Sequence, residues 1–158
     1  MTFASFVVVA LLSIFGVASI MEFYKKTIRK GQSKTWENWV VGAVLSFGVA
    51  TLDCLTGIAY IFFSNAMVVN ILIYGVVFFF VQMFVDMKII KALITSAMAT
   101  MDIEKFVLIV LDKFGLTVDK IKGILKKLGI TQEKFAEALR DAGFPEDKIE
   151  TLIKMFYE

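Results

Sequence analysis

The chain has 158 residues, of which 58% are hydrophobic, a share above that of ordinary soluble domains. Histidine is absent and Cys54 is the single cysteine, so the sequence excludes histidine chemistry and an internal disulfide. Residues 1–85 hold five basic and three acidic side chains, whereas residues 86–158 hold twelve of each, so no basic tail indicates nucleic-acid binding.

The first predicted element is a membrane span over residues 3–21, nineteen residues without a charge. At about 1.5 Å per residue this helix is just long enough to cross a hydrocarbon core of about 30 Å. A cleaved signal peptide is the alternative, but its positive charge would precede the apolar run, and here the charge follows it. We therefore expect a retained span with its N-terminus outside.

A basic loop follows, between Glu22 and Asn38. Short loops rich in Lys and Arg remain in the cytoplasm, and Trp36 and Trp39 are typical of residues that anchor helix ends at a membrane surface. The loop is interpreted first as a topology signal; recruitment of anionic lipid is the alternative. Its basic residues are Lys25, Lys26, Arg29, Lys30 and Lys34.

The second predicted span, residues 39–63, contains a single charge, Asp53. Counted along the helix, Asp53 would lie about 21 Å from Trp39 and about 15 Å from Phe63, close to the bilayer centre. The sequence Ser64-Asn65 is expected to form a tight turn into a third span, residues 67–85. Residues 1–85 are thus predicted to form a three-span domain, with the N-terminus outside and the C-terminus in the cytoplasm.

Beyond the third span, residues 86–99 keep a helical pattern of apolar residues, without glycine or proline. This pattern predicts a juxtamembrane helix that continues the third span, as one straight or bent helix, to about Ala99.

Residues 100–158 are predicted to form a cytoplasmic module of four short helices. The segments that begin at Gly115, Gly129 and Gly143 resemble one another at a period of about 14 residues, and a degenerate copy begins at Met101. In each unit glycine closes one helix, and Thr117, Thr131 or Pro145 begins the next. Helices this short are not stable alone in water, so they must pack together.

Two further features of the module admit alternatives. Residues 106–111 are apolar all round, which favours the centre of the module over a position on the membrane surface. The helix after Thr117 is basic and the last helix is acidic; mutual attraction is the simpler explanation, and contact with lipid headgroups or an acidic partner is the other.

Asp53 is the strongest candidate functional residue, because a carboxylate inside a bilayer needs a partner or a proton. No span contains Lys, Arg or His, so we expect a protonated acid hydrogen-bonded to Tyr74, Thr56 or Ser13. It is interpreted either as a proton- or cation-handling site or as polar glue between helices. Small residues around it predict a helix-packing face: Gly42, Ser46, Ala50 and Gly57, with Gly75 on the third span.

The order of three spans, a tight turn and a charged tail resembles the layout of three-span phage holins. The resemblance is one of topology and rests on no sequence motif, so we do not assign the chain to that family. The first functional hypothesis is a non-enzymatic, multi-pass protein of the cell (inner) membrane. It would self-associate into a homo-oligomer through the Asp53 face and present residues 100–158 to a cytoplasmic protein partner. The alternative is a holin-like or channel-like pore; no cofactor, metal or nucleic acid is expected.

Overall fold

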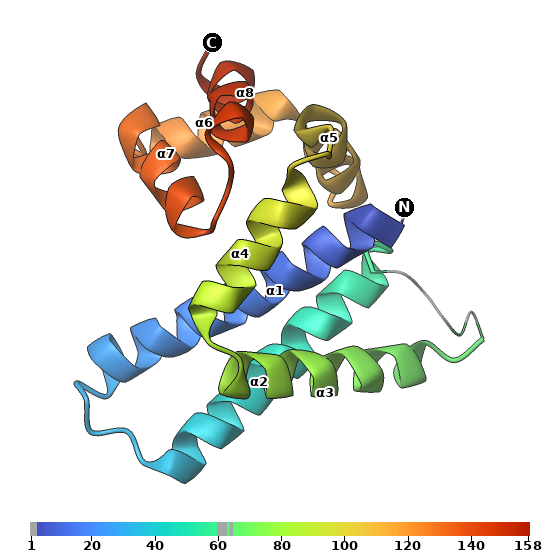
Figure 1. The fold of residues 1–158 in the computed structure, drawn as a ribbon, viewed down its shortest axis with the longest axis vertical. Helices are drawn as coiled ribbons and strands as arrows, with labels where there is room; N and C mark the ends of the chain where they lie inside the picture. Colours follow the sequence, from blue (N-terminus) through green and yellow to red (C-terminus); the bar gives the residue numbers. More distant parts are fainter. Residues whose placement is uncertain (1–2, 60–62, 64) are drawn as a thin grey trace. The chain divides into compact units, whose positions relative to one another are not determined.

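The computed structural model describes residues 3–59, 63 and 65–158, and every regular element in these residues is a helix (Figure 1). The chain divides into two compact units, one ending at Ile90 and the other comprising Lys91–Glu158. The all-helical prediction is confirmed. Three helices are long and apolar enough to cross a membrane: Phe3–Ile28, Thr35–Leu55 and Met67–Phe84.

The first unit is a bundle of these three helices, each of which contacts the other two. Helix α1 (Phe3–Phe23) runs directly into a π-helical turn, Tyr24–Ile28. Helices α2 (Thr35–Leu55) and α3 (Met67–Phe84) complete the bundle. Many large apolar side chains on α2 and α3 are exposed, such as Val44 and Val68, which are 67% and 69% exposed. A broad exposed apolar surface is unusual for a soluble monomer and matches a protein whose outer face meets lipid.

Helix α2 ends eight residues before the predicted limit at Phe63. Gly57 takes a left-handed conformation (φ +68°), and its N–H group donates to the Cys54 carbonyl (3.2 Å). The Ile58 N–H group donates to the Asp53 carbonyl (3.1 Å), which completes a Schellman motif. The predicted turn residue Ser64 and residues 60–62 of the predicted span lie outside the described residues.

The predicted continuous helix through residues 86–99 is wrong, because α3 stops at Phe84 and α4 (Met87–Met98) is a separate helix. Val85 has an extended backbone (φ −94°, ψ 132°). The Asp86 carboxylate accepts a hydrogen bond from the Lys88 N–H group (2.8 Å). Asp86 thus acts as an N-cap, which starts a new helix where the apolar pattern alone predicts continuation.

The second unit contains the latter part of α4 and four short helices: α5 (Ile103–Lys113), α6 (Val118–Lys127), α7 (Gln132–Asp141) and α8 (Glu146–Tyr157). Side chains of Asp102, Thr117 and Thr131 accept N–H hydrogen bonds at the starts of α5, α6 and α7. Gly115, Gly129 and Gly143 have positive φ angles just after α5, α6 and α7. Thr117, Thr131 and the three glycines therefore form the local caps that the sequence indicates, and Asp102 adds one that was not predicted.

Helix α8 is the central helix of this unit, since it contacts α5, α6 and α7. Ile149, Leu152 and Phe156 form its buried face. The prediction of an entirely central α5 is wrong in part: Phe106 is buried, whereas Leu108 and Ile109 are exposed. Only one face of α5 is buried, although residues 106–111 are apolar on every face of the helix.

Gly75 tests the close packing of α2 against α3. A Cβ atom at Gly75 would overlap the Phe47 ring, so we expect Gly75→Ala to lower the free energy of unfolding by about 1–3 kcal/mol. Gly48 lies on α2 with nothing within 4 Å of its ideal Cβ, so Gly48→Ala is the matched control. The measurement is unfolding in mixed detergent micelles, and equal stability of the two variants would contradict this packing.

A substitution at Gly143 can test packing within the second unit, against Lys91 of α4, in the same way. Its Cβ would lie 2.7 Å from the Lys91 carbonyl oxygen, whereas the equivalent position at Gly129 is open. Both glycines have positive φ angles, so alanine at either position should lower the free energy of unfolding by about 1–2 kcal/mol. Gly143→Ala should lower it further, because its Cβ would overlap the Lys91 carbonyl oxygen. Hydrogen exchange of α8 amides should therefore increase more in Gly143→Ala than in Gly129→Ala; the reverse order would refute the contact.

Candidate functional site

Asp53 lies in the last turn of α2, with its carboxyl group buried in the three-helix unit. Its Oδ2 accepts a hydrogen bond from the Ser13 hydroxyl of α1 at 2.7 Å. The structure thus brings together Asp53 and its predicted partner Ser13. Because the same chain supplies both groups, the bond ties α1 to α2 within one copy.

The position of Asp53 along the helix differs from the prediction near the bilayer centre. With α2 spanning Thr35–Leu55, Asp53 lies about 27 Å from Thr35 and only about 3 Å from Leu55. The predicted depth assumed a helix that continued to Phe63. The Schellman motif at Gly57 removes this continuation and places the acid near one end of the candidate span.

The other two predicted partners have different surroundings. The Thr56 hydroxyl donates to backbone carbonyl oxygens, those of Leu52 at 2.7 Å and Asp53 at 3.4 Å. Tyr74 is buried, and its ring packs against those of Phe6 and Phe78, with centroid distances of 5.4 and 6.1 Å. Thr56 therefore helps to end α2, and the Tyr74 ring belongs to an aromatic contact between α1 and α3.

The predicted helix-packing face is used inside the unit. Gly42, Ser46 and Ala50 are buried on α2. A Cβ atom at Gly42 would lie 2.8 Å from Gln82 Nε2 of α3, so the two helices approach closely there. Gly57 lies beyond the end of the helix and is not part of this face. Glycine suits position 57 because the backbone there has a positive φ angle. Helix α3 and the Ser13 contact from α1 thus cover the face that sequence analysis assigns to self-association.

The five basic residues of the loop lie at the other end of α2 from Asp53. Arg29 pairs with Glu37 of α2 at 2.8 Å, and Lys26 pairs with Glu22 at 3.3 Å. Lys25 belongs to the π-helical turn, and Lys30 has a positive φ angle of 47°. The second carboxylate oxygen of Glu37 accepts from the Lys34 N–H group at 3.3 Å. The loop is thus fastened to the start of α2, beside the exposed rings of Trp36 and Trp39.

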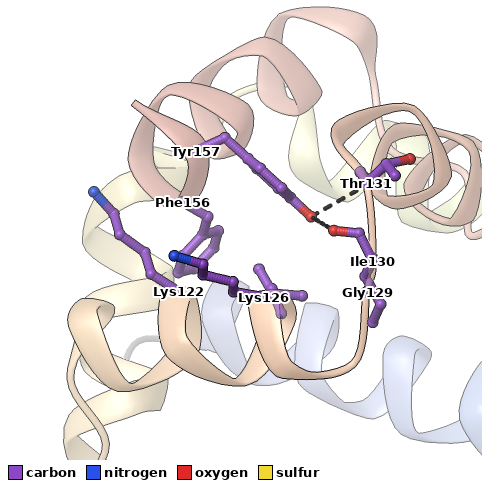
Figure 2. Close-up of a pocket in the computed structure, with 8 residues that line it drawn as sticks. Lys122, Lys126, Gly129, Ile130, Thr131, Phe156 and Tyr157 are labelled. Atoms are coloured by element: carbon purple, nitrogen blue, oxygen red, sulfur yellow. Dashed lines mark hydrogen bonds between the residues drawn. The ribbon is translucent and has the colours of Figure 1, made fainter.

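The second unit contains a pocket of about 450 Å³ that sequence analysis does not predict (Figure 2). Its apolar wall comes from Leu125 of α6, Ile130 and Phe156 of α8. The Tyr157 hydroxyl donates to the Ile130 carbonyl (3.0 Å) and also lies within 3.4 Å of the Thr131 carbonyl. The remaining lining residues are Lys122, Lys126 and Gly129. This pocket combines apolar surface with two cationic side chains.

The predicted attraction between the basic α6 and the acidic α8 is not found among the ion pairs of the described residues. Glu146 binds Arg140, with 3.1 Å between its Oε2 and Nη2, and Asp147 pairs with Lys148 at 3.3 Å. The hydrogen bond from Arg140 also lowers the pKa of Glu146. The acidic residues at the start of α8 are therefore paired with nearby residues. The lysines of α6 form no ion pair within the described residues, so they are available for another contact.

Within the described residues, no three acidic or Cys side chains gather where they could hold a metal ion. Comparison with protein-family models, with curated proteins and with solved structures finds no match to this chain.

The Ser13–Asp53 hydrogen bond can be tested by substitution. Asp53→Asn keeps an oxygen acceptor, so we expect near-normal stability, whereas Asp53→Leu removes the acceptor and should lower the free energy of unfolding by about 1 kcal/mol. Ser13→Ala should have a similar effect. Unfolding in mixed micelles, followed by tryptophan fluorescence, measures the change.

Thr51→Val is the control, because the Thr51 hydroxyl donates only to the Phe47 carbonyl of its own helix among the bonds of the described residues. We expect it to be close to neutral. The intrachain role of the bond would be refuted if Asp53→Leu left unfolding unchanged but reduced the mass of a detergent-solubilised oligomer. That result would mean that Asp53 joins copies.

Proposed function

We propose that this chain is a non-enzymatic, multi-pass membrane protein that holds a helical interaction module at the cytoplasmic surface of the cell (inner) membrane. The main support for this proposal is the distribution of polar groups in the first unit. The Ser13–Asp53 hydrogen bond lies between α1 and α2, while α2 and α3 expose apolar side chains. This arrangement suits a bundle surrounded by lipid, which has no water to solvate an exposed carboxylate.

The proposed orientation rests on charge. Five Lys/Arg residues lie between the first and second helices, and the segment after α3 also begins with charged residues, including Lys88 and Lys91. The positive-inside rule places both regions in the cytoplasm, with the N-terminus and the α2–α3 connection outside. The module of residues 100–158 then lies in the cytoplasm.

The geometry favours an anchor over a pore. In a pore of several copies, Asp53 carboxyl groups would face a shared channel, but here residue Asp53 is 7% exposed and its carboxyl group is hydrogen-bonded to Ser13. Self-association through Gly42, Ser46 and Ala50 is disfavoured for the same reason, since that face is already buried. Neither a channel nor a homo-oligomer formed through this face is part of the proposal.

The absence of catalysis is also a proposal and rests on residue types. The chain contains no histidine, and its one thiol, Cys54, is buried inside the first unit. Binding is therefore the function that the charged, capped helices of the module support best.

Cysteine labelling tests the orientation. In a Cys54→Ala background, single cysteines replace three exposed residues: Gln32 in the basic loop, Asn65 between α2 and α3, and Gln132 at the start of α7. We expect a membrane-impermeant maleimide to label Asn65→Cys in intact cells. Gln32→Cys and Gln132→Cys should react only after the membrane is permeabilised.

Retention of the protein in the membrane pellet after alkaline carbonate extraction is the control for integral insertion. Labelling of Gln132→Cys in intact cells, with Asn65→Cys protected, would reverse the orientation. Release of the protein by carbonate would refute the membrane anchor itself.

A further inference from the structure

The pocket between α6 and α8 combines an apolar wall with two lysines. Its volume of about 450 Å³ falls within the range of about 300–1,000 Å³ that is typical of ligand sites. Leu125 and Phe156 are largely buried and provide an apolar wall. A bulky apolar side chain of a partner could fill this space and displace water from it.

The wall of the pocket is held in place by contacts behind it. The Tyr157 hydroxyl donates to the Ile130 carbonyl at 3.0 Å, which links the end of α8 to the α6–α7 connection. The Phe135 ring packs against Phe156 and Tyr157, with centroid distances of 5.9 and 5.6 Å. Burial and the charge of Glu133 raise the pKa of Tyr157, which further favours the protonated hydroxyl that donates this hydrogen bond. These contacts preorganise the site, which reduces the cost of binding.

Two lysines give the pocket its charge. Lys122 and Lys126 are four residues apart on α6 and therefore lie on the same helix face. Figure 2 shows both side chains extending from α6 beside Phe156. Neither lysine forms an ion pair within the described part of the chain. Glu146 and Asp147, at the start of α8, pair instead with Arg140 and Lys148. The pocket thus has the ammonium groups of Lys122 and Lys126, without ion pairs, beside its apolar wall.

We propose that this pocket binds an acidic peptide segment of a partner protein, with a bulky apolar side chain against Leu125 and Phe156 and carboxylates paired with Lys122 and Lys126. This inference rests on the proposed function, which places the module in the cytoplasm, and it adds the site and the partner's chemistry. A recessed pocket with a fixed wall suits an inserted side chain better than a flat layer of lipid headgroups. Carboxylates beside the anchoring side chain satisfy the lysine charge.

The test uses the full chain in nanodiscs of zwitterionic phosphatidylcholine. The probe is a fluorescein-labelled helical peptide of Glu and Leu residues with one central Trp, and the comparison peptide replaces every Glu with Lys. We expect saturable binding of the acidic peptide, measured by fluorescence anisotropy, and weaker binding as the salt concentration rises. The basic peptide should not bind.

Charge reversal locates the site. The double variant K122E/K126E should bind the acidic peptide at least about tenfold more weakly and should gain affinity for the basic peptide. The control K113E/K127E makes the same change in net charge at two exposed lysines that do not line the pocket, and its affinity should stay within about twofold of the original. Circular dichroism checks that both variants keep their helix content.

Three results would overturn the inference. They are no saturable binding of the acidic peptide, equal loss of affinity in both double variants, or protection of residues 118–130 from hydrogen exchange by phosphatidylserine nanodiscs without peptide. The last result would assign the lysines to lipid headgroups. Failure here leaves the cysteine-labelling result intact, so failure of the pocket and failure of the membrane orientation are separable.

Discussion

One residue, Asp53, fixes two features of the membrane-type bundle through different atoms. Its carboxyl group accepts the Ser13 hydroxyl and joins α1 to α2, while its main-chain carbonyl accepts the N–H groups of Ile58 and Ala59 and ends α2. Asp53, Ile58 and Ala59 are buried, and a polar group shielded from water needs a hydrogen-bond partner. The end of α2 and its contact with α1 therefore depend on the same residue.

The sequence is sufficient to predict the all-helical architecture and three helices long and apolar enough to span a membrane. Helix ends are harder to predict where both neighbouring segments are apolar. Gly57 closes α2 in the same way that Gly115 closes α5, but the apolar residues around Gly57 also suit a continued membrane helix. Asp86 is similar: a single N-cap interrupts a pattern that is helical on both sides. In both cases a local hydrogen bond outweighs hydrophobic periodicity.

The candidate sites were predictable to different degrees. Ser13 is a predicted partner of Asp53 because both fall at a similar depth when the spans are aligned, and this contact forms. The pocket of the second unit is not visible in the sequence, since residues 122–131 and 156–157 meet only through packing of α8. The four-residue spacing of Lys122 and Lys126 was the available signal, but only the folded chain places apolar surface beside them.

The break at Val85–Asp86 also has a consequence for the surrounding bilayer. It limits α3 to 18 residues, which corresponds to about 27 Å along the helix axis, whereas the 21 residues of α2 correspond to about 31 Å. A short span in a thick hydrocarbon layer is accommodated by local thinning of the bilayer, by snorkelling of flanking residues or by oligomerisation, at a cost that rises with each ångström of mismatch. In the proposed arrangement α3 is the shortest crossing segment, so its length sets the bilayer thickness in which the protein is most stable.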